Sequence, residues 1–255
     1  MFPHLKSLSF LNRYGNSLFP YFAVKSSSGY LNSYRAFGVK AFLLDSMRET
    51  ISEASSSLRS LGIFGEVFWK CNVQHFSALV DLTLILLTDI GPLGTIFTPA
   101  SQLRSLTLYV RGHCSGNLAF VLRAHSDALP LLTAFRLSYP DIERDHSEAM
   151  AAFLRKKPLL ERLDVGHDRF TPAFDEIQPV LEILRELPRL RTLGYGLISD
   201  WDSPGLTRDT LLHLSRYIPP GLIALSLWVS ADAGQTSAIT EADWIQFVQP
   251  SSYFF

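Results

Sequence analysis

Cysteine is scarce in this sequence, long apolar runs are missing, and neither sign of charge is in excess. Cys71 and Cys114 are the two cysteines, and their wide separation fits neither a C-x-x-C motif nor the closely paired cysteines of secreted repeat proteins. A net charge of −1 leaves no field to attract nucleic acid or an anionic membrane. Asp81 interrupts the longest apolar candidate, residues 79–87, well below the ~18 residues of a membrane span. With no visible secretory signal, these absences predict an intracellular location, cytoplasmic or nuclear, without nucleic-acid or membrane partners.

Motifs of familiar catalytic sites are also missing. The sequence has no G-x-S-x-G, no H-E-x-x-H, no P-loop and no complete G-x-G-x-x-G. His113-Cys114 begins like a phosphatase loop, but Phe120 stands where the loop needs arginine, and the nearest arginine is Arg123. The seven histidines have no spacing typical of metal ligands. We therefore expect no catalytic residue, no cofactor and no metal, and predict that the protein is not an enzyme.

A short leucine motif, by contrast, recurs along the whole chain. The form L-x-x-L-x-L, with other apolar residues replacing some leucines, occurs eight times. Its alternating apolar positions are typical of a strand with one buried face. The motif predicts strands near residues 5–10, 58–63, 79–84, 103–108, 132–137, 160–165, 190–195 and 222–227. A further strand at 34–39 is left open, because its spacing fits but residues 26–33 have the composition of a loop.

The spacing of the motif indicates the architecture. From the second motif on, successive motifs start 21 to 32 residues apart, which brackets the length of leucine-rich repeats. Helical periodicity fills the intervals at 45–54, 115–129, 148–157, 175–187 and 207–217. Strands that return to the same side after each helix pair in parallel. We predict an α/β fold: a right-handed leucine-rich-repeat solenoid, or horseshoe, of about eight or nine repeats, with a concave parallel β-sheet and helices on the convex side. Residues 1–255 would form this single domain, with a C-terminal cap helix near 241–248.

The residues between the buried leucines are expected to face the hollow of this sheet. Most of them are small and neutral, and a few are charged or aromatic. Arginine and aromatic residues dominate the energetics of protein interfaces. The predicted protein-binding residues on the concave face are Phe64, Asp81, Tyr109, Arg136, Arg162, Asp164 and Trp228. The alternative for each of them is ordinary packing against neighbouring strands.

Three strand openings with a proline carry a resemblance to a known family. Residues 2–8 (FPHLKSL), 157–163 (KPLLERL) and 187–193 (LPRLRTL), together with the irregular repeats, resemble the leucine-rich-repeat region of F-box proteins from mushroom-forming fungi. These belong to the ribonuclease-inhibitor-like repeat superfamily. The resemblance implies the substrate-recognition part of a ubiquitin ligase, with a target protein held in the hollow.

The F-box that would bind the ligase adaptor is not recognisable in this sequence. The chain opens directly on a repeat, so an adaptor is expected as a partner only if an F-box lies upstream. Two alternatives stay open at this point: a leucine-rich-repeat scaffold that binds a protein without ubiquitin chemistry, and a truncated fragment without a function of its own.

Overall fold

The computed structural model is built on one parallel β-sheet. It describes residues 7–9, 49, 51–52, 56–139, 142–166, 174–197, 208–229, 240, 242–243 and 247. Eight strands follow one another in sequence order, and every neighbouring pair is parallel. They are β1 (Ser7–Ser9), β2 (Ser60–Phe64), β3 (Asp81–Asp89), β4 (Ser105–Ser115), β5 (Ala134–Ser138), β6 (Arg162–Gly166), β7 (Thr192–Leu197) and β8 (Ala224–Val229). Each strand for which the sequence made a prediction overlaps the predicted residues.

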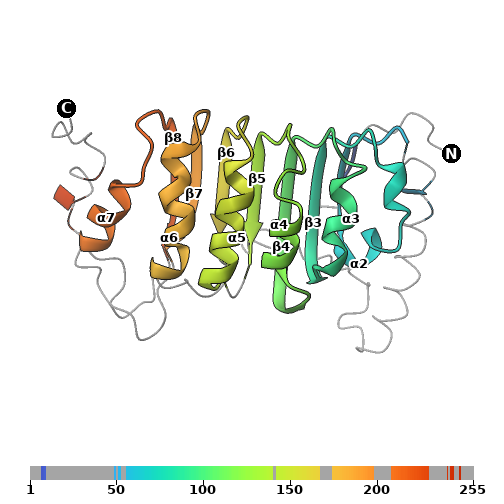
Figure 1. Cartoon of the computed structure of the whole chain (residues 1–255), viewed down its shortest axis with the longest axis horizontal. Helices are drawn as coiled ribbons and strands as arrows, with labels where there is room; N and C mark the ends of the chain where they lie inside the picture. Colours follow the sequence, from blue (N-terminus) through green and yellow to red (C-terminus); the bar gives the residue numbers. More distant parts are fainter. Residues whose placement is uncertain are drawn as a thin grey trace, which may run out of the picture.

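The helices form a single layer in front of this sheet, and the elements run along the long axis of the molecule in chain order (Figure 1). The α-helices are α2 (Gly65–Phe68), α3 (Gly94–Phe97), α4 (Leu118–Ala124), α5 (Arg144–Arg155), α6 (Phe174–Ile183) and α7 (Arg208–Ser215). Short 3₁₀ helices occur at η1 (Val73–His75), η2 (Gly91–Leu93) and η3 (Leu184–Glu186). The opposite side of the sheet therefore carries none of these described helices.

The hydrophobic core lies between the sheet and the helices. Strand pairing aligns the middle leucine of successive motifs, so that one buried row crosses the sheet through Leu61, Leu82, Leu106, Phe135, Leu163 and Leu193. Phe153 of α5 packs on this row, with its ring centroid 5.8 Å from that of Phe135. Because these side chains alternate with outward ones along each strand, the row also fixes which residues face away from the helices.

A repeated turn sets the start of each strand. Six carbonyl oxygens each accept hydrogen bonds from two successive amides of the next unit; they belong to Arg59, Val80, Arg104, Thr133, Glu161 and Arg191. Just before each strand, a second bond closes a four-residue turn, as from the amide of Leu160 to the carbonyl of Lys157. The equivalent position is apolar in the preceding turns, at Phe76, Ala100 and Leu129, and again at Leu187. Lys157 is therefore a lysine in a core position.

The strand β3 departs from the regular pattern. Its pairing with β4 shifts after Leu84, and Leu86 has a φ of 53°, in the left-handed region. Ile85, whose place in the motif predicts an outward side chain, is only 4% exposed. Ile85 still pairs in register with Phe64 of β2, and the regular alternation of faces ends beyond it, where the pairing with β4 shifts.

Several predicted elements lie outside the described residues. These are the alternative strand at 34–39, most of the helix at 45–54 and most of the cap helix at 241–248. Of the described helices, none is both long enough and apolar enough to cross a membrane.

Candidate ligand-binding site on the sheet

Strand pairing brings the charged residues of the outward face together on β4, β5 and β6. Thr107, Arg136 and Asp164 lie side by side in one row. Ser105, Ala134 and Arg162 form the row next to it, two residues earlier on the same strands. Both rows point away from the core, because the residue between them on each strand belongs to the buried row.

Arg136 lies at the centre of this group and is held on two sides. Its Nε donates to Asp164 Oδ2 at 3.2 Å, and its Cζ lies 5.1 Å from the centroid of the Tyr109 ring. The Arg136 side chain remains 30% exposed, while that of Asp164 is 5% exposed. The ion pair and the cation–π contact fix the plane of the guanidinium.

A hollow opens beside Arg136. It has a volume of about 150 Å³ and is lined by Ser105, Thr107, Ala134, Phe135, Arg136 and Arg162. The side chains of Ser105 and Ala134 are short, so they do not fill the space next to the long side chains of Arg136 and Arg162. The hollow thus combines two guanidinium groups with two hydroxyl groups, and it is smaller than the ~300–1,000 Å³ typical of sites for drug-sized ligands.

Burial changes the acid–base properties of this group. It raises the pKa of Asp164 above its ordinary value, although the charges of Arg136 and Arg162 oppose the rise. It also raises the pKa of Tyr109, again against the effect of Arg136. The phenol is therefore neutral near pH 7, and the two guanidinium groups favour the charged carboxylate.

One carboxylate oxygen of Asp164 has no hydrogen-bond partner. Oδ2 bonds Arg136, but Oδ1 is buried and unpaired. A buried acceptor without a partner costs free energy, and native structures contain few of them. This oxygen marks a place where a hydrogen-bond donor is missing.

Four of the predicted site residues meet here and three do not. Tyr109, Arg136, Arg162 and Asp164 form the group described above. Asp81 is exposed on β3, next to Ser105, and Phe64 is half-buried against the hydrophobic core. Trp228 lies on β8, with its side chain outside the described part of the molecule.

The sequence prediction missed the residues that make the hollow. Ser105, Thr107 and Ala134 were recognised as outward positions but not chosen, because small neutral residues carry no chemical signal on their own. Their alignment beside Arg136 and Arg162 in the repeated motif was the sequence feature that could have indicated the hollow. Two short side chains between two long ones leave a gap.

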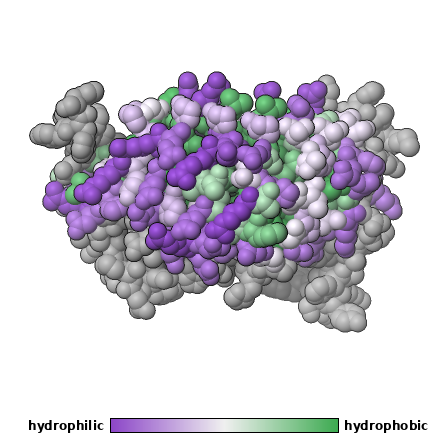
Figure 2. Space-filling model, viewed as in Figure 1, coloured by the Kyte–Doolittle hydropathy of each residue, from purple (hydrophilic) through white to green (hydrophobic). Residues whose placement is uncertain are grey.

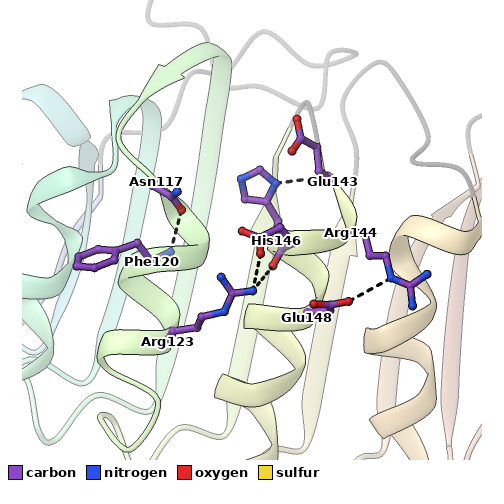
Figure 3. A network of polar contacts seen from close by, with 8 residues as sticks. Asn117, Phe120, Arg123, Glu143, Arg144, His146 and Glu148 are labelled. Atoms are coloured by element: carbon purple, nitrogen blue, oxygen red, sulfur yellow. Dashed lines mark hydrogen bonds and ion pairs between the residues drawn. The ribbon is translucent and has the colours of Figure 1, made fainter.

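The helix side of the molecule offers a second cluster of polar residues. Arg123 of α4 pairs with Asp145 of α5 at 2.6 Å, and Arg144 pairs with Glu148 at 3.1 Å. Figure 3 shows Arg144 pointing toward Glu148. In the same picture, His146 Nδ1 accepts from the Glu143 amide at the start of α5. The surface around this cluster is mostly hydrophilic with smaller apolar areas (Figure 2). These charges are exposed and neutralise one another in pairs, so they stabilise the helix ends and provide no enclosed site.

The described residues also bear on two other kinds of site, a metal site and a thiol site. No group of three or more His, Cys, Asp or Glu side chains within them is arranged to hold a metal ion. His113 and Cys114 belong to the backbone of β4, and their side chains lie outside the described part.

Comparisons with known proteins do not assign this chain to a family. No family model matches it, and no curated protein does. Among solved structures it is similar to a sugar phosphate isomerase/epimerase from Parabacteroides distasonis, with 10% sequence identity and a TM-score of 0.23. The similarity covers 70% of this chain and 89% of that one.

This result corrects several sequence-based predictions. The solved structure named above is an enzyme and not a repeat protein, which is contrary to the predicted leucine-rich-repeat solenoid class, to the F-box ubiquitin-ligase function with its scaffold and fragment alternatives, and to the prediction that the protein is not an enzyme. The physical reason for the error is that L-x-x-L-x-L encodes a parallel strand with one buried face. That property sets strand position and register without specifying a family. At a TM-score of 0.23 the similarity carries no argument for a fold or an activity of this chain either.

Proposed function

We propose that the protein binds a small carboxylate ligand in the hollow between Arg136 and Arg162. The observation that carries this proposal is the placement of two guanidinium groups on neighbouring strands around an open space of about 150 Å³. Guanidinium groups donate paired hydrogen bonds to carboxylates with matching geometry.

The charge balance of the group supports an anion. Arg136 and Arg162 contribute two positive charges, and Asp164 offsets one of them through its bond to Arg136. Arg162 is exposed, so its guanidinium is accessible to a ligand that enters the hollow. The hydroxyl groups of Ser105 and Thr107 lie in the lining and add neutral donors.

Titration with propionate, followed by amide NMR, tests the proposal. We expect saturable shifts centred on residues 134–136 and 162–164. Arg136→Gln and Arg162→Gln should each weaken binding on the order of tenfold, because each removes a charge-assisted hydrogen bond.

Arg144→Gln is the matched control. Arg144 lies on α5, where it pairs with Glu148, and the same substitution there should leave propionate binding unchanged. If Arg144→Gln weakens binding as much as the two sheet variants, the anion binds on the helix side and the proposal is wrong.

Two further expectations remain proposals alongside this one. A protein partner, predicted from the sequence, would fit the hollow through the carboxylate of a side chain or a chain terminus. An intracellular location, also predicted from the sequence, is the other.

A further inference from the structure

We propose that the ligand carries a neutral hydrogen-bond donor on the carbon next to its carboxylate, and that Asp164 Oδ1 accepts from this donor. The inference rests on the proposed carboxylate site and specifies its ligand class. The class includes α-hydroxy acids and the C-terminal residue of a peptide, which share a carboxylate beside a neutral O–H or N–H group.

One carboxylate oxygen of Asp164 lacks a hydrogen-bond donor. Oδ2 pairs with Arg136, while Oδ1 is buried without a partner. A bound donor would remove the cost of leaving this acceptor unpaired. No such gain is available from a ligand that has only a carboxylate.

Asp164 lies close to both arginines of the hollow. It follows Arg162 by two residues on β6, so both side chains leave the same face of the sheet, and it lies directly beside Arg136 on β5. Neighbouring strands are about 4.8 Å apart, and alternate residues of one strand are roughly 6.6 Å apart. The three charged groups are therefore within the span of one small ligand.

Access to Oδ1 requires movement of an arginine side chain. The oxygen is closed to solvent in the structure, but Arg162 is exposed and Arg136 is 30% exposed. Both side chains are long and have several rotatable bonds. Asp164 does not line the hollow in this structure, so the proposal requires that a bound carboxylate draws one guanidinium aside and thereby opens a path from its neighbouring donor to Oδ1.

The charge of the group selects a neutral donor over an ammonium. Arg136, Arg162 and Asp164 together leave one unit of positive charge, which a single carboxylate ligand balances; Asp81 lies one strand farther away, beyond Ser105. An ammonium group on the ligand would restore the unit of positive charge that the carboxylate balances. It would also be repelled by both arginines, because it would lie close to them. A hydroxyl or an amide N–H makes the same hydrogen bond without that repulsion.

Four probes with one carbon skeleton test this inference: propionate, lactate, N-acetylalanine and alanine. They place hydrogen, hydroxyl, amide N–H or ammonium on the α-carbon. We expect lactate to bind about tenfold more tightly than propionate, as for a hydrogen bond to a charged acceptor, and alanine to bind no better than propionate. N-acetylalanine distinguishes the sources: tighter binding than lactate favours a peptide C-terminus, and weaker binding favours a small hydroxy acid.

The Asp164→Ala variant identifies the acceptor. It should still bind propionate, but it should bind lactate no more tightly than propionate. If the variant does not fold, Asp164→Asn keeps the shape with a weaker, neutral acceptor and should reduce the preference for lactate by several-fold.

Some results would contradict the preference for a neutral donor, and one result would contradict the carboxylate site itself. Equal binding of propionate and lactate to the wild type overturns this inference and leaves the carboxylate site standing. So does a preference for alanine, or a preference for lactate that survives in both Asp164 variants. Absence of saturable binding by all four probes overturns the carboxylate site as well.

Discussion

Lys157 shows how one residue departs from the repeated turn. Its side chain fills a core position that is apolar in the turns on either side, and it is fully buried. Nζ donates to the carbonyl of Ser126 at 2.5 Å and lies 3.9 Å from the centroid of the Phe153 ring. Burial lowers the pKa of the amine to about 8. The contacts reduce the cost of burying the amine but do not remove it.

This lysine predicts a pH dependence of stability. Between pH 8 and 10.5 the unfolded chain holds the proton that the folded chain has lost, so the free energy of unfolding rises with pH across this interval, by up to about 3 kcal/mol. The gain is lost progressively as the pH falls from 10.5 to 8. Lys157→Met should remove this rise, and denaturant unfolding at a series of pH values measures it.

Lys156→Met provides the comparison for this prediction. Lys156 is the neighbouring residue, with a side chain that is 60% exposed, and its substitution should keep most of the pH-dependent rise, because burial is the largest cause of the lowered pKa of Lys157 and the charge of Lys156 a smaller one. A profile of Lys157→Met that is parallel to the wild type from pH 8 to 10.5 would show that burial does not shift the titration of Lys157.

At the same scale, the chemistry of the candidate site was partly visible in the sequence. Arg136, Arg162, Asp164 and Tyr109 were predicted because charged and aromatic residues stand out among small neutral ones. The unpaired oxygen of Asp164 was not predictable, since the motif only assigns that residue to the outward face. Its burial depends on how Arg136 and neighbouring groups pack around it.

Among the strands, β6 offers the sharpest test of the register. Leu163 is fully buried and lies between Phe135 and Leu193 in the central row. Leu163→Asp places a charge between sheet and helices and should cost more than ~3 kcal/mol of unfolding free energy. Chemical denaturation measures the difference.

The adjacent residue is the control for this substitution. Arg162 is exposed on the other face of β6, so Arg162→Asp should change stability far less. Similar costs for the two variants would mean that the assignment of faces on β6 is incorrect.

The elements also show where sequence patterns stop being informative. Strands were predictable because each carries the same alternation of buried and outward residues. The one-turn helices α2 and α3 were missed, since four residues cannot show a helical period. Gly65 of α2 is needed for a contact that periodicity does not reveal: a Cβ at this position would clash with Leu87 of β3.

For the whole molecule, the serial order of strands predicts a gradient of protection. In the described part of the chain, β1 and β8 pair on one side, whereas β4, β5 and β6 pair on both. Leu225 of β8 is only half-buried, in contrast to the fully buried Leu163. Amide hydrogen exchange should therefore be slowest in β4–β6, and about tenfold or more faster in β8, because opening of an end strand disrupts fewer contacts. Uniform protection across the sheet would contradict this prediction.

The paired hydrogen bonds at the strand starts also bear on how such a chain tolerates change over evolutionary time. Each carbonyl of this kind, such as that of Thr133, holds the first two amides of the next unit, so every strand takes its alignment from the turn before it. A length difference in one connecting segment is absorbed before the next strand begins. This explains how strand starts separated by 21 residues, from Ser60 to Asp81, and by 32, from Thr192 to Ala224, coexist in one aligned sheet. Insertions and deletions between units should accordingly be tolerated one segment at a time, without shifting Arg136, Arg162 and Asp164 relative to one another.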